Sequence, residues 1–108
     1  MTYTVEAAEK AVQWLIDHAE DIADARAERV KREEMLKPIR SVIMAQFADK
    51  PVGVQEREAL AHPRYAEAVD ALAEAVKRDE TNRALVKAAE LKVEVWRSMQ
   101  ANLRAARV

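Results

Sequence analysis

The sequence of 108 residues contains no cysteine, a single glycine (Gly53), three prolines and few aromatic residues. Without cysteine the chain has neither disulfides nor thiolate metal ligands, which fits a cytoplasmic location. With so little glycine and proline it lacks the turns that a β-sheet protein needs. No apolar run approaches the ~18 residues of a membrane span. The first residues carry acids early and no basic stretch before an apolar one, so we expect no signal peptide.

Good helix formers are abundant instead, and 34% of the residues are charged. Apolar side chains recur every three or four positions, a spacing typical of amphipathic helices. The pattern predicts an all-α fold in one helical domain, residues 1–108. Two long helices are expected at about 4–48 and 63–107, joined by a loop and a short helix at 49–62. Thr4 is suited to cap the first of them.

Prolines and polar stretches predict where these helices are interrupted. Pro38 and the polar stretch before it predict a kink or break near 26–38. Residues 49–54 form the clearest loop. Pro63 suits the first position of the second long helix. In that helix the polar stretch 77–82 contains capping residue types, so the helix either breaks there or runs straight through.

Folded back on each other, the two long helices make an antiparallel hairpin whose facing residue numbers sum to about 111. Trp14 then lies beside Trp96, and the polar stretch 26–34 faces 77–85. The apolar stripes are wider than a two-helix seam, so the surplus apolar surface predicts assembly into an oligomeric bundle. A monomeric bundle of four shorter helices is the alternative. The side chains expected in the core or at an interface are Trp14, Ile43, Phe47, Tyr65 and Trp96.

The chain contains histidines, serines and carboxylates, but their spacing is not that of an active site. His18 lies near several aspartates, but a solvated acidic helix face explains these better than a metal site. His62 precedes Pro63 and suits a helix start. The chain has no Gly-rich phosphate loop, and neither histidine has a serine nearby. We therefore predict no catalytic residue, no metal, no cofactor and no enzymatic activity.

Charge alternates along the chain, although the net charge is only −1. Residues 1–25 and 41–76 are acidic, whereas 26–40 and 77–108 are basic. Such blocks either pair with one another or attract a polyanion. In the hairpin, two basic stretches meet at mid-length and form a candidate site for nucleic-acid phosphates. Its residues are Arg26, Arg29, Lys31, Arg32, Lys77, Arg78 and Arg83.

The segment AAELKVEVWRSMQANLRA (88–105), which follows EREALAHPRY (56–65), resembles small helical proteins of phage recombination cassettes. More distantly, the chain is similar to the UvsY-type recombination mediators. The trailing Trp-Arg…Ala-Asn-x-Arg-Ala pattern carries the resemblance. It implies an oligomer that binds single-stranded DNA and helps to load a recombinase. It marks Trp96, Arg97, Asn102 and Arg104. Trp96 lies on the apolar stripe of its helix, which indicates a packing anchor. Arg97 and Arg104 suit DNA phosphates or inter-subunit acids, and Asn102 suits a hydrogen bond across an interface.

Two functions are therefore expected. The first is an oligomeric recombination mediator of phage or prophage origin, with itself, single-stranded DNA and a recombinase as partners, and no membrane. The second is a helical protein–protein interaction module of a mobile element, acting as an inhibitor, adaptor or structural subunit.

Overall fold

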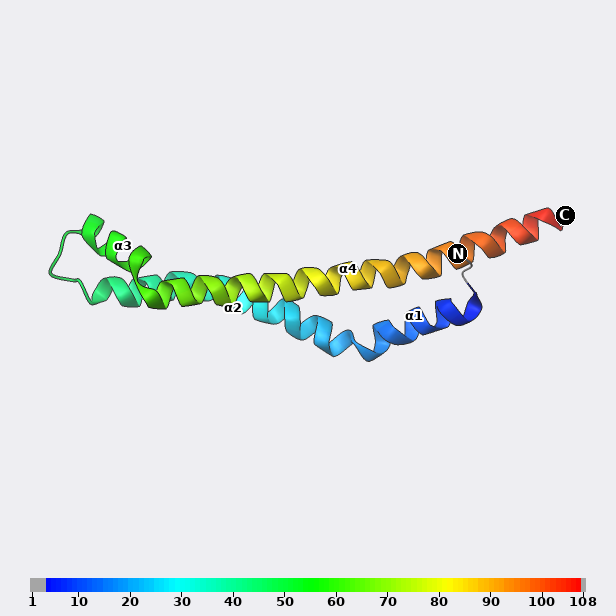
Figure 1. The fold of residues 1–108 in the computed structure, drawn as a ribbon, viewed down its shortest axis with the longest axis horizontal. Helices are drawn as coiled ribbons and strands as arrows, with labels where there is room; N and C mark the ends of the chain where they lie inside the picture. The colour runs from blue at the N-terminus through cyan, green and yellow to red at the C-terminus, as the bar shows by residue number, and fades with distance from the viewer. Residues whose placement is uncertain (1–3, 108) are drawn as a thin grey trace. The chain divides into compact units, whose positions relative to one another are not determined.

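The computed structural model describes residues 4–107, which form four α-helices and no strand. The helices are α1 (Val5–Asp17), α2 (Ala19–Ala45), α3 (Val52–Ala61) and α4 (Pro63–Ala106), shown in Figure 1. The all-α prediction is confirmed. Within residues 4–107, no helix is long and apolar enough to cross a membrane.

The chain divides into two compact units, and both long helices contribute to each of them. Unit 1 comprises Met1–Ala23 with Glu80–Val108, of which residues 4–23 and 80–107 are described. It contains α1, the start of α2 and the second part of α4. Unit 2 is Asp24–Asp79 and contains most of α2, all of α3 and the first part of α4. The sequence predicts a single domain, and it does not indicate this division.

α1 begins at the predicted cap and ends at a residue that the sequence does not mark. Thr4 is extended, and its hydroxyl accepts a hydrogen bond from the Ala7 N–H at 3.2 Å. At the other end, the His18 backbone N–H donates to the Trp14 carbonyl at 3.0 Å. The imidazole Nδ1 lies 2.9 Å from the same oxygen, and the ring stacks on the Trp14 indole with centroids 4.4 Å apart. The imidazole therefore shares a carbonyl that keeps its backbone donor at the end of α1, and α2 starts anew at Ala19.

Of the kink or break predicted near 26–38, the break is wrong, because α2 runs through this stretch with Pro38 inside it. A kink there stays a prediction. A helical proline leaves the carbonyl four residues earlier, here that of Glu34, without its backbone donor. Both Pro38 and Glu34 are exposed, so water can hydrate this carbonyl. α4 likewise continues through 77–82 without a break. The structure therefore differs from the alternative of four shorter helices broken at these two stretches.

The connection between α2 and α4 is more ordered than the sequence suggests. α2 ends at Ala45 and not near 48, and the following residues form turns. α3 starts at Val52, so the predicted loop at 49–54 is shorter. The Pro51 carbonyl accepts hydrogen bonds from the backbone N–H groups of the third and fourth residues after it, both at 3.0 Å. Proline is compatible with a helix start, because the first N–H groups of a helix have no partner there.

The core of the described residues is made almost entirely of alanine. The buried apolar side chains are Ala8, Ala11, Ala25, Ile43, Ala59, Ala75 and Ala89, and Asp79 is buried with them. Large apolar side chains are exposed on all four helices, among them Ile16 (63%), Val52 (63%) and Leu91 (51%). Alanine lets helices approach closely, but each buried methyl group stabilises the fold by only ~0.8 kcal/mol. Much of the apolar area that would stabilise this chain therefore remains in contact with solvent.

Candidate interaction surfaces

In unit 2 the polar stretches of α2 and α4 meet at a partly buried ion pair. Arg29 Nη1 lies 3.1 Å from Asp79 Oδ2, and Arg29 Nε lies 3.1 Å from Glu33 Oε1. The Asp79 side chain is only 6% exposed, whereas that of Arg29 is 26% exposed. The facing numbers here sum to 108 and not to about 111, because α2 ends three residues earlier than predicted. Asp79 lies inside the continuous α4 and binds Arg29, so it does not cap a new helix.

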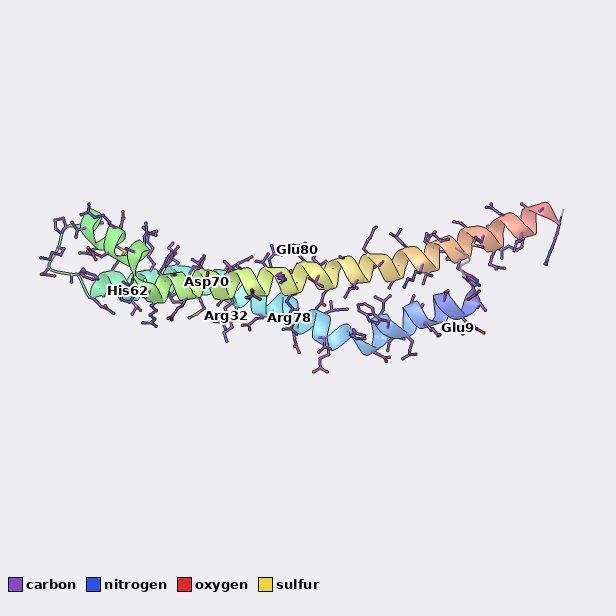
Figure 2. All side chains as sticks on the ribbon, viewed as in Figure 1. Glu9, Arg32, His62, Asp70, Arg78 and Glu80 are labelled. Carbon is purple, nitrogen blue, oxygen red and sulfur yellow. The ribbon has the colours of Figure 1, made fainter. Side chains whose placement is uncertain are left out.

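Beside this ion pair, a shallow groove of mixed charge runs between α2 and α4. Its lining residues are Glu28, Arg32, Ala71, Glu74, Ala75 and Arg78. Arg32 and Arg78 are labelled in Figure 2. Arg32 Nε lies 2.8 Å from Glu28 Oε1, so one of the two cations in the groove already has an anionic partner. A groove with two acids and two bases has no strong preference for a polyanion.

The candidate DNA-binding residues divide into paired and exposed groups. In unit 1, Arg83 lies 3.7 Å from Glu80 and Arg97 lies 3.4 Å from Glu94. In unit 2, Arg29 and Arg32 are paired as described, and Lys77 also has an interaction partner. The remaining candidates are exposed and make no ion pair within residues 4–107; they are Arg26, Lys31, Arg78 and Arg104. Since Arg83 belongs to unit 1, the structure groups only six of the seven mid-hairpin bases in one unit.

In unit 1, Trp96 of α4 faces α1. It lines a shallow apolar hollow with Val5, Ala8, Glu9, Val12 and Gln13. The predicted contact of Trp14 with Trp96 is wrong, because Trp14 stacks on His18 and Trp96 lies nearer the start of α1.

A second apolar seam on α4 faces away from α1. Val86, Ala89 and Val93 are buried or half-buried, as expected for the face toward α1. Ala84, Ala88, Leu91 and Val95 are all exposed and follow one another at spacings of four, three and four residues. This spacing keeps side chains on one face of a helix, here roughly opposite the face toward α1. We call these four residues the α4 outer seam.

The other candidate core or interface residues lie at different depths. Ile43, expected in the core or at an interface, is fully buried. The ion pair of Arg40 with Glu56, at 3.9 Å, places α3 against this end of α2. Phe47 and Tyr65 are half-buried, which is compatible with a role in the core and with a role at an interface. Asn102 is exposed near the end of α4.

Neither the remaining polar side chains nor the comparisons with known proteins point to a further site. Within residues 4–107, no group of three or more histidine or acidic side chains is placed to hold a metal ion. His62 Nδ1 accepts a hydrogen bond from the Arg64 N–H at 3.1 Å, so it supports the start of α4. The chain matches no protein-family model, no curated protein and no solved structure.

Two features of these surfaces were not predicted from the sequence. The burial of Asp79 has no sequence signal, because an acid in a polar stretch is expected to be solvated. The outer seam is visible as a heptad spacing, but periodicity alone does not show which of two apolar stripes a neighbouring helix covers.

Proposed function

We propose that this chain is a helical protein–protein interaction module that works as a self-associated assembly. The distribution of apolar side chains carries the proposal, because alanines fill the core while leucines and valines face solvent. Contiguous exposed apolar surface on a folded protein marks an interaction site. The antiparallel hairpin and the oligomeric bundle expected from the sequence belong to this proposal.

The charged residues support a protein partner more than a nucleic acid. Several of the cations that the sequence offered for phosphate binding already pair with acids on the same helix or across the α2–α4 contact. Using these cations on a polyanion requires breaking such pairs, and the net charge of −1 gives no long-range attraction. An inhibitor, adaptor or structural subunit of a mobile element is compatible with such a module.

Measuring the mass of the full chain in solution tests the self-association. The chain has a mass of 12.2 kDa. Light scattering during size-exclusion chromatography, at loading concentrations up to about 300 µM, is expected to give at least twice this mass. A single species of 12.2 kDa over the whole range would refute self-association.

Single-stranded DNA remains a second candidate function, favoured by one specific observation. Arg26, Lys31 and Arg78 are exposed in unit 2 and carry no ion-pair partner within the described residues. As a recombination mediator, the assembly would multiply these cations along a DNA backbone and present the DNA to a recombinase.

The DNA function has a salt-dependent signature. Binding to an unstructured labelled oligonucleotide should be measurable at ~50 mM salt and fall steeply by ~200 mM. Arg78→Glu should weaken it, whereas Arg57→Glu, an exposed cation on α3, should not. No binding at the lower salt concentration would eliminate this function and leave the interaction module standing.

A further inference from the structure

The α4 outer seam has the pattern of a helix that pairs with another helix. Leu91 and Val95 are 51% and 37% exposed, and the adjoining Leu85 is 46% exposed. Ala84 and Ala88 continue the seam toward the middle of α4. In a coiled coil, positions spaced alternately by three and four residues form the core of the contact. α1 lies on another face of α4, so within unit 1 it leaves this seam uncovered.

We infer that the outer seam binds the same seam of a second copy of this chain, with the two α4 helices antiparallel. Two independent features select this occupant and this direction: the sizes of the seam residues and the charges along the edges of the seam. The pairing rests on the self-association proposed above, and it adds the residues and the orientation.

The sizes of the seam residues favour the antiparallel direction. With the helices antiparallel and centred near residue 90, Ala88 lies opposite the partner's Leu91, and Ala84 lies opposite the partner's Val95. Each layer of the contact then combines one small and one larger side chain, so the distance between helix axes stays even. Parallel pairing would set alanine on alanine and leucine on leucine in successive layers. Such a seam leaves gaps at the alanine layers, which packed interfaces avoid.

Charges along the seam select the same direction. Lys87 and Glu94 lie on one edge of the seam, seven residues apart, and Lys92 lies on the other edge. In the antiparallel pair, residues of the same edge face each other, so Lys87 meets the partner's Glu94, and the symmetric contact repeats it. In a parallel pair, Lys87 would meet the partner's Lys92 on both sides, which is repulsive.

Glu94 remains available for this contact. Its ion pair with Arg97 is 3.4 Å long, and both side chains are more than 60% exposed. Exposed pairs of this kind contribute little to stability, so Glu94 can also accept the partner's lysine. On the opposite edge, Leu85 meets the partner's Lys92, whose aliphatic stem covers apolar surface.

Charge reversals distinguish the two directions by the sign of their effect. Lys87→Glu should weaken the dimer about tenfold, because it puts acid against acid at two symmetric contacts. Glu94→Lys should also weaken it, and the double reversal should restore the affinity to within about threefold. Lys92→Glu is the matched control, because its partner is apolar, and it should change the affinity little. A parallel pair predicts tighter binding for both single lysine reversals.

The absence of cysteine allows a direct test of register in the full chain. Ala88→Cys and Leu91→Cys chains of different tag length are mixed and oxidised gently. The mixed disulfide between the two variants should form fastest, because only opposed residues come within disulfide distance. Predominant disulfides between two Ala88→Cys chains would overturn the antiparallel pairing.

The outcomes separate the inference from the function on which it rests. A monomeric wild-type chain contradicts both. Three results would contradict the antiparallel pairing and leave self-association intact. They are tighter dimerisation of the Lys87→Glu chain, no change in affinity for any charge reversal, and disulfides that form only between identical variants. Far-UV circular dichroism should be unchanged in the charge variants, because all three positions are exposed.

Discussion

Removing Arg29 should destabilise the protein far more than removing Asp79, although the two residues form one ion pair. Arg29→Met keeps the aliphatic stem but strands a carboxylate that is 6% exposed. Breaking a buried pair from one side costs about 3–5 kcal/mol, and the partial exposure of Arg29 places this case near 3 kcal/mol. Asp79→Ala leaves Arg29 26% exposed and still 3.1 Å from Glu33, so its cost should be about 1 kcal/mol.

The double variant completes the test. With both charges removed, no ion is buried without a partner, so the loss should resemble that of Asp79→Ala alone. Urea unfolding followed by circular dichroism measures all four proteins, at one fixed protein concentration because association adds to stability. Equal losses of stability for the two single variants, or a larger loss for Asp79→Ala, would show that the burial of Asp79 does not determine how much this ion pair contributes to stability.

Two further predictions concern the core and the helix break. Ile43→Ala should lower the free energy of unfolding in urea by about 2–4 kcal/mol, because Ile43 is fully buried. Val42 is 49% exposed, so Val42→Ala should lower it by less than about 1 kcal/mol. Similar losses for the two variants would contradict the assigned core. Because the imidazole shares the Trp14 carbonyl with the backbone N–H, His18→Ala should make the backbone chemical shifts at residues 17–19 helical. Persistence of the break would show that the imidazole does not cause it.

The sequence predicted the helices better than their interruptions. Thr4 and Pro63 mark helix starts through local chemistry, which one sequence contains in full. The break at His18 coincides with a side-chain contact that no propensity scale encodes. At Pro38, local chemistry predicted an interruption, but the exposed position lets water replace the lost hydrogen bond, and α2 continues.

The interaction surfaces were predictable only in outline. Surplus apolar surface follows from stripes that are wider than a two-helix seam, but the stripes do not show that Ile43 is fully buried while Leu91 is exposed. Periodicity places residues on faces, and tertiary packing decides which face is covered. The basic stretches were visible as composition, but their pairing with acids such as Asp79 depends on which helices lie side by side.

The central claim is that the exposed apolar residues of α4 hold copies of this chain together. Sedimentation equilibrium of the wild-type chain beside Leu91→Glu tests it most directly, because Leu91 is exposed at the centre of the outer seam. The wild-type mass should be at least twice 12.2 kDa, and the variant should return toward 12.2 kDa with its helical circular dichroism intact. Equal masses for the two proteins would contradict the claim.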